Sequence, residues 1–301
     1  MTRSYSALLL ALAAIWGASY LFIKVGVRDF QPTVLITLRL LIAATLLIGF
    51  LAAREGGREA LVQIGRAWRE GVIFGVINGA LPFTLIAWGE KHIDSGVAAI
   101  ANASVPIFVA LLAIRFKRSE RSTGMRLVGI FVGLAGVGVI VGVHPEGGGW
   151  AVLGTLAVVL ASLFYAAGGL YGQHALGRVR GPVVATASML YGGLLLMPFA
   201  LVQLPAQAPG WKSVGSLLGL AVAGTAVAQL ILFRMLRLFG AARLSLVTYL
   251  LPVTALIYGA LILDEPFRAP ALAGLVLILA GVALGSGAWR PLRRPAVEPA
   301  P

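Results

Sequence analysis

The sequence contains no cysteine and is short of charge, since only 12% of its 301 residues are Asp, Glu, Lys or Arg. The absence of cysteine excludes disulfides, thiolate nucleophiles and sulfur ligands for a metal. The 59% of apolar residues excludes a disordered chain and leaves too little polar surface to cover a water-soluble globule. The composition therefore indicates an integral membrane protein.

Residue patterns of catalytic centres and ATP-driven motors are also missing. The three histidines, His92, His144 and His174, fall in expected loops or at expected helix ends, as do the acidic residues. The chain has neither a His-Glu-x-x-His spacing nor a P-loop signature. We therefore expect no metal and no cofactor, and a membrane-embedded enzyme is a weaker interpretation than a transport protein.

Long apolar runs dominate what is present. A membrane-spanning helix needs about 20 mostly apolar residues, and ten runs of that kind occur, at 6–27, 32–52, 71–90, 94–114, 124–143, 150–172, 182–203, 213–233, 240–263 and 269–289. The first run imitates a signal peptide, but we expect it to be retained because it continues through bulky Trp16, Tyr20 and Phe22. The fold class predicted is an all-α bundle of ten transmembrane helices.

The 24 basic residues are distributed unequally between the two sides of this bundle. Eighteen fall on the side of the N-terminus, and four, Arg28, Lys91, Lys212 and Arg268, fall on the other. This positive-inside bias places both termini in the cytoplasm, so the excess charge reports topology and predicts no nucleic-acid partner. The Pro-rich basic stretch 290–301 is predicted to be a disordered cytoplasmic tail, and the multi-pass chain is expected in the plasma (inner) membrane.

The chain contains an internal repeat. Residues 119–142 align without gaps to 264–287 with eight of 24 positions identical, Glu120/Glu265 among them. One residue of slippage upstream pairs Asn102 with Thr248 and Pro106 with Pro252. Five helices per half, an odd number, require halves of opposite orientation, here 1–143 and 150–289. Inverted repeats are a recurring architecture of secondary transporters, with substrate held between the halves.

These segments resemble a known family. SGVAAIANASVPIFVALLAIRFKRSE followed by LVGIFVGLAGVGVIVG, and ARLSLVTYLLPVTALIYGALILDEP with LAGLVLILAGVALG, are similar to the helix 4–5 and helix 9–10 signatures of the EamA branch of the drug/metabolite transporter superfamily. IWGASYLFIKVG and LRLLIAATLL resemble its helix 1 and helix 2 motifs, whereas SLFYAAGGLY departs from its helix 6 pattern. The resemblance implies a ten-helix exporter of small metabolites, in many members amino acids, with a central cavity.

Polar and aromatic side chains within the spans are the candidate substrate contacts. An amide facing lipid is unfavourable, so such residues either line a cavity or join helices, and packing is the alternative for each aromatic. The candidates are Trp16, Tyr20, Arg39, Asn78, Asn102, Tyr165, Gln229, Thr248 and Tyr249. Pro82, Pro106 and Pro252 are candidate hinges, because proline removes a backbone hydrogen bond.

Arg39 is the most informative charge. It follows Pro32 by seven residues, and two interpretations remain open: snorkelling to the outer headgroups, or facing a cavity to pair with Glu90 or a substrate carboxylate. No acidic residue occupies a midplane position, so facilitated or exchange transport is as plausible as proton antiport. The sequence thus predicts a secondary transporter exporting small metabolites, most plausibly amino acids, by alternating access. The alternatives are a multidrug or other metabolite carrier, or a channel; the partners are substrate and bilayer, and a monomer is allowed.

Overall fold

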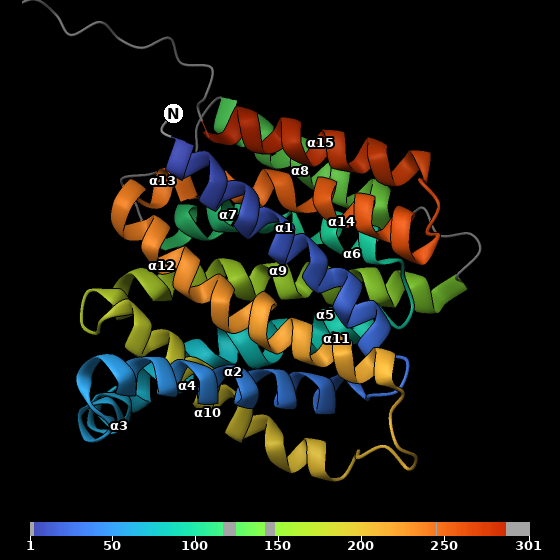
Figure 1. The fold of residues 1–301 in the computed structure, drawn as a ribbon. Helices are drawn as coiled ribbons and strands as arrows, with labels where there is room; N and C mark the ends of the chain where they lie inside the picture. The colour runs from blue at the N-terminus through green and yellow to red at the C-terminus, as the bar shows by residue number, and fades with distance from the viewer. Residues whose placement is uncertain (1–2, 117–124, 142–147, 245, 287–301) are drawn as a thin grey trace, which may run out of the picture.

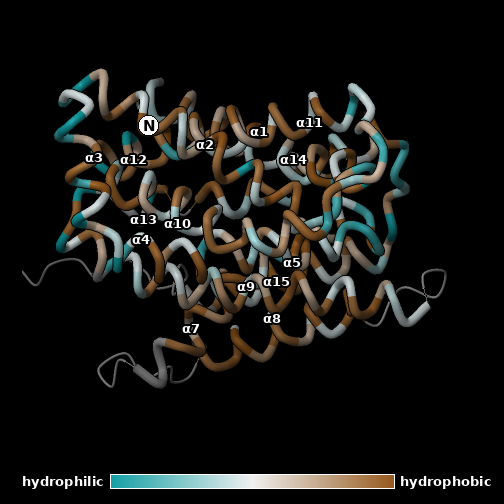
Figure 2. Tube along the Cα trace, turned by 90° about the horizontal axis from the view of Figure 1, so that it is seen from below, coloured by the Kyte–Doolittle hydropathy of each residue, from teal (hydrophilic) through white to brown (hydrophobic). Residues whose placement is uncertain are grey.

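The computed structural model describes residues 3–116, 125–141, 148–244 and 246–286, and within these ranges the regular structure is entirely helical. The helices form one bundle, in which α8 and α15 lie side by side along one edge and α2 and α10 lie along the opposite edge (Figure 1). A broad apolar middle separates two polar ends (Figure 2). This is the distribution expected of a bundle whose sides face lipid and whose ends face water.

Within the described ranges, the N-terminal half runs through eight α-helices and one π-helical segment. They are α1 (Arg3–Gly26), α2 (Pro32–Glu55), α3 (Gly57–Arg66), α4 (Trp68–Gly75), η1 (Val76–Ala80), α5 (Leu81–Gly89), α6 (Ser95–Asn102), α7 (Val105–Phe116) and α8 (Met125–Val141).

The C-terminal half has the same general course. It consists of α9 (Gly148–Leu176), α10 (Gly181–Leu201), α11 (Trp211–Ala221), η3 (Val222–Val227), α12 (Ala228–Phe239), α13 (Ala241–Leu244), α14 (Val247–Leu263) and α15 (Ala269–Ser286). Across both halves, seven described helical stretches are long and apolar enough to cross a membrane, and three shorter apolar helices accompany them.

Four of the expected continuous helices are interrupted, three near their centres and one near its start. The run 71–90 passes through η1 just before Pro82, which cannot donate a backbone hydrogen bond. The run 94–114 breaks after Asn102, and Pro106 lies in the first turn of α7. The run 213–233 contains η3, and the run 240–263 has a turn at Leu246 before α14. Pro252 lies inside α14 without breaking it.

Helix α3 was not among the expected helices. It is amphipathic: Ala60 and Ile64 are buried and pack with Leu51 of α2 and Val183 of α10, while its polar side chains face outward. Arg180, which precedes α10, pairs with Glu55 at the end of α2 at 2.7 Å. One end of the bundle is formed by α3, α13 and the start of α1, and it is called here the basic end (Figure 1).

Hydrogen bonds and an ion pair join the loops at the opposite end. Lys24 Nζ donates to the backbone carbonyls of Glu90 (2.8 Å) and Ile93 (2.7 Å). The Glu265 carboxylate accepts hydrogen bonds from the backbone N–H of Ser95 (2.9 Å), the Ser95 hydroxyl (2.7 Å) and the backbone N–H of Gly96 (3.2 Å). These contacts, together with the Arg268–Asp94 ion pair (3.2 Å), are called the latch below. The latch ties α1 and the α14–α15 loop to the start of α6.

Glycines permit the closest helix contacts. A Cβ on Gly75 of α4 would lie 2.5 Å from the Ser188 carbonyl of α10, and one on Gly192 would lie 3.0 Å from the Gly75 carbonyl. Such crossings depend on backbones approaching without side chains between them, which stabilises helix pairs in lipid.

Helices α8 and α15 cross with a reciprocal contact. The Cα of Gly136 faces the Gly274 carbonyl, and that of Gly281 faces the Gly129 carbonyl. In the repeat alignment Gly136 corresponds to Gly281 and Gly129 to Gly274. Each contact is therefore the repeat equivalent of the other, which is the pattern of a twofold interface.

Candidate functional site

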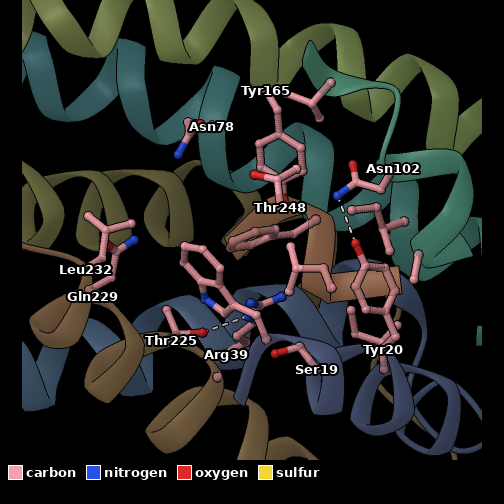
Figure 3. A pocket seen from close by; sticks show the side chains of 18 of the residues that line it. Ser19, Tyr20, Arg39, Asn78, Asn102, Tyr165, Thr225, Gln229, Leu232 and Thr248 are labelled. Atoms are coloured by element: carbon pink, nitrogen blue, oxygen red, sulfur yellow. Dashed lines mark hydrogen bonds between the residues drawn. The ribbon is translucent and has the colours of Figure 1, made fainter. Parts of the chain in front are cut away.

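A cavity of about 340 Å³ lies within the bundle, and eight of the nine candidate substrate contacts line it. They are Trp16, Tyr20, Arg39, Asn78, Asn102, Tyr165, Gln229 and Thr248. Its walls come from both halves. From the first half α1, α2, η1 and α6 contribute, and from the second half α9, η3, α12 and α14 contribute. Figure 3 shows the labelled polar side chains converging on this space from different helices.

Arg39 is held inside the cavity wall. Its Nε donates to the Thr225 hydroxyl at 2.8 Å (Figure 3), and its guanidinium carbon lies 3.7 Å from the centroid of the Phe83 ring. Only 4% of its surface is exposed, so the structure supports the cavity-facing interpretation and not snorkelling. Within the described ranges no carboxylate forms an ion pair with Arg39, Glu90 included. Of the two partners considered for a cavity-facing Arg39, Glu90 is therefore not the one bonded to it in the described structure, which leaves a substrate carboxylate as the alternative.

The π-helical segment η3 presents Thr225 to this cation. The Thr225 hydroxyl donates to the Leu220 carbonyl five residues earlier at 2.9 Å. Its oxygen then remains an acceptor for Arg39. Widening of the helix therefore creates a bonding site that a regular α-helix would not place in this position.

A second hydrogen-bonded group lies across the cavity. The Asn102 side chain, at the break between α6 and α7, donates to the Tyr20 hydroxyl at 2.8 Å. The Ser162 hydroxyl of α9 lies 3.1 Å from the Asn102 carbonyl oxygen. These two hydrogen bonds join α1 and α6 of the first half to α9.

The remaining candidates occupy the rest of the wall. Asn78 lies in η1 and packs closely on Gly168 of α9. A Cβ added to Gly168 would lie 2.8 Å from the side-chain oxygen of Asn78. Tyr165 packs edge-on against Phe83, with ring centroids 6.1 Å apart. Thr248 lines the cavity from the first turn of α14. Tyr249, the next residue, lies outside the cavity lining and packs against the main apolar core.

Sixteen of the 24 lining residues were not among the candidates, and three of these matter for the polar groups of the site: Ser19, Phe83 and Thr225. Serine and threonine in a helix can bond their own backbone, as Ser19 does to the Ile15 carbonyl at 3.2 Å. Phe83 is one apolar residue among many in a membrane helix. The signal that existed was the four-residue spacing of Thr225 and Gln229, which places them on one face of a helix.

The cavity extends toward the basic end. Leu176 at the end of α9, Val184 at the start of α10 and Leu236 near the end of α12 all line it. Toward the latch its deepest lining residues are Ile23 and Ile86, each close to a latch residue in sequence. The cavity is therefore closed by the latch and approaches the surface at the basic end.

We expect Asn102→Ala to weaken substrate binding roughly five- to 150-fold, because losing such a contact costs about 1–3 kcal/mol. Thr248→Val should have an effect in the same direction. Thr45→Val is the matched control, since Thr45 is exposed and bonds only its own helix within the described structure. Binding isotherms and melting curves of the purified variants check this. Unchanged affinity with a clear loss of stability would identify both residues as links between helices.

Comparison with known proteins agrees with this architecture. The model of the EamA-like transporter family matches the chain twice, at residues 3–142 and 152–286. One solved crystal structure superimposes with a TM-score of 0.65 at 19% identity, over 95% of this chain and 97% of that one. At that identity the likeness concerns the fold.

Sequence relatives extend over nearly the whole length. A protein of Archaeoglobus fulgidus named as a transporter is 29% identical over 89% of this chain and 93% of its own. The inner membrane transporter YedA of Escherichia coli is 28% identical over 83% of this chain and 80% of its own. A probable amino-acid metabolite efflux pump of Escherichia coli is 26% identical over 94% of both chains. The two matches to the family model cover nearly all of 3–286, and the chain belongs to the EamA-like transporter family.

Proposed function

We propose that this membrane transporter is a secondary carrier that exports small metabolites, with amino acids as the leading class, by alternating access. The observation that carries the proposal is the cavity itself, which combines one buried cation with three amides and several aromatic walls. Its volume of about 340 Å³ falls in the range of small-molecule sites, which are mostly apolar with a few placed polar groups. A relative named as a probable amino-acid metabolite efflux pump supports the same class.

The arrangement of charge in the cavity fits a carboxylate. Arg39 uses its Nε on Thr225, so its other N–H groups remain as donors for an anion. Arginine suits a carboxylate because its planar fork can bind both oxygens. The Tyr20–Asn102 pair, on another wall, supplies hydrogen-bonding oxygens for an amino group.

The proposal includes ten transmembrane helices in two inverted halves, 1–143 and 150–289, with both termini cytoplasmic and a cytoplasmic tail at 290–301. Seven long spans plus three shorter apolar helices support the count. The reciprocal α8–α15 contact supports inversion, because the two helices cross antiparallel while occupying equivalent repeat positions. The plasma (inner) membrane is the location, in agreement with the relative YedA.

Single cysteines test the topology, since the natural chain has none to interfere. An impermeant maleimide should label Gly57→Cys only from the cytoplasm and Ala208→Cys only from outside; both positions are exposed. Ser119 and Ala296, outside the described residues, are expected on the cytoplasmic side, and Gly148 on the outside. Labelling of Gly148→Cys from the cytoplasm would contradict the ten-helix arrangement.

Transport itself is tested in vesicles. A panel of amino acids is first screened by thermal stabilisation, because a ligand of the folded state raises its melting temperature. Flux of the best binder through reconstituted protein should saturate and show counter-transport. Flux that rises linearly with concentration, without counter-transport, would indicate a channel and overturn the carrier proposal.

A further inference from the structure

Glu90 is a buried carboxyl group without a hydrogen-bonding partner. It directly follows α5, has 0% of its surface exposed, and neither carboxylate oxygen has a hydrogen bond in the described structure. It does not line the cavity. Glu90 is therefore not one of the proposed substrate contacts.

The charged groups around Glu90 come from three elements, and each is already bonded elsewhere. Lys24 of α1 donates to the Glu90 and Ile93 backbone carbonyls. Glu265, after α14, accepts from Ser95 and Gly96. Arg39 of α2 donates to Thr225. These three are the charges that act electrostatically on the Glu90 carboxyl, and the Tyr20 hydroxyl also lies within electrostatic range.

The surroundings of Glu90 favour the neutral form of its carboxyl group over the ionised form. An ionised carboxylate buried without hydrogen bonds carries a large desolvation cost, whereas the neutral acid carries a much smaller one. The nearby ammonium of Lys24 reduces that cost but is directed at two carbonyls, and the negative Glu265 increases it. Opening the latch would admit water to Glu90 and remove most of the difference.

We propose that Glu90 is a proton-binding site that couples protonation to closure of the latch. In the closed arrangement Glu90 carries a proton; when the latch opens, its O–H bond breaks heterolytically and the proton passes to water. The proton returns as the latch closes. This inference rests on the alternating-access proposal, since the latch closes the end of the cavity away from the basic end.

The linkage has a definite direction. The closed state binds the proton more tightly than the open state, so acid favours closure and alkali favours opening. The site belongs to one end only, because the alignment that pairs Asn102 with Thr248 pairs Glu90 with Leu236. A proton bound there therefore biases the transporter toward the state whose cavity approaches the basic end.

The test measures opening of the latch directly, without substrate. Val97 is 3% exposed in α6 beside the latch, so Val97→Cys reacts with a maleimide only when this end opens. Its rate is divided by that of the exposed Ala208→Cys, which corrects for thiol ionisation. We expect the ratio to rise about tenfold or more from about pH 5 to about pH 9 in purified protein. With Glu90→Gln added, the ratio should be low and independent of pH.

Matched controls separate Glu90 from its neighbours. Glu59→Gln removes an exposed carboxyl on α3 and should leave the pH dependence intact. His92→Asn should also leave it intact, because His92 is not among the groups that act electrostatically on Glu90. Burial, with help from Lys91 and Lys24, lowers the pKa of His92 and so disfavours its charged form. Glu90→Asp keeps an ionisable carboxyl at this position and should keep the pH dependence, which provides a readout if Glu90→Gln fails to fold.

A flat ratio in the natural sequence, or a pH dependence that survives Glu90→Gln, would overturn the proton site. Loss of the pH dependence in a folded Glu90→Asp protein would do the same. Because the measurement needs no substrate, its outcome is independent of flux. Normal coupling in the labelling experiment with no flux in vesicles would leave the proton site standing while contradicting the carrier function.

Discussion

Replacing Arg39 by alanine should weaken binding of a carboxylate substrate about 10- to 150-fold, because a hydrogen bond to a charged group contributes about 1.5–3 kcal/mol. The loss of affinity should be large for substrates that carry a free carboxylate. An amide or ester of the same amino acid lacks the negative charge, so its affinity should change much less. Calorimetric titration of both compounds against both proteins measures the difference.

Arg39→Lys refines this result. Lysine keeps the positive charge but has no planar guanidinium group. It therefore cannot bond Thr225 through one nitrogen, as Arg39 does through Nε, while its other nitrogens bind an anion in the cavity. We expect part of the carboxylate affinity to return, with a melting temperature close to that of the natural sequence. Equal affinity for the carboxylate in the alanine variant and the natural protein would leave Arg39 with a structural role only.

The second large effect concerns stability. Gly75→Leu should lower the free energy of unfolding by about 3 kcal/mol, because any Cβ at this position meets the Ser188 carbonyl at 2.5 Å. The opposing atoms are backbone, so they cannot rotate away, and α4 and α10 must separate. This corresponds to a fall in melting temperature of roughly 10 °C.

Gly49→Leu is the matched control, since Gly49 is an exposed helical glycine in α2, and a Cβ added there would have nothing within 4 Å. Its melting temperature should stay within about 2 °C of the natural protein. Fluorescence-detected melting in one detergent compares the three proteins. If both leucine variants melt alike, close contact at Gly75 is not what holds α4 against α10.

Much of the architecture was predictable because hydrophobic length and the placement of arginines are properties of a linear sequence. The family and the helical membrane class are confirmed by the two matches to the family model. Interruptions of helices were harder to predict. Pro82 and Pro106 signalled two of them, but η3 contains no proline, and nothing in VAGTAV distinguishes a π-helical segment from a regular helix.

The cavity residues were predictable for a related reason. Polar groups are costly in lipid, so Asn78, Asn102 and Gln229 had to face inward or pair, and all three line the cavity. Tyr249 carried no such constraint, and its neighbour Thr248 occupies the cavity-facing position instead. The partner of Arg39 could not be predicted, because Thr225 reaches it only through the local geometry of η3.

The reciprocal contact between α8 and α15 has a consequence for how such a chain arose. Gly136 against Gly274 and Gly281 against Gly129 form the interface of an antiparallel homodimer, built within a single polypeptide. A duplicated and fused gene would give this contact at once from an ancestral half that inserted into the bilayer in both orientations. In such a fused chain the two halves would be free to diverge, and Glu90 and Leu236, which the repeat alignment pairs, are an example of such a difference.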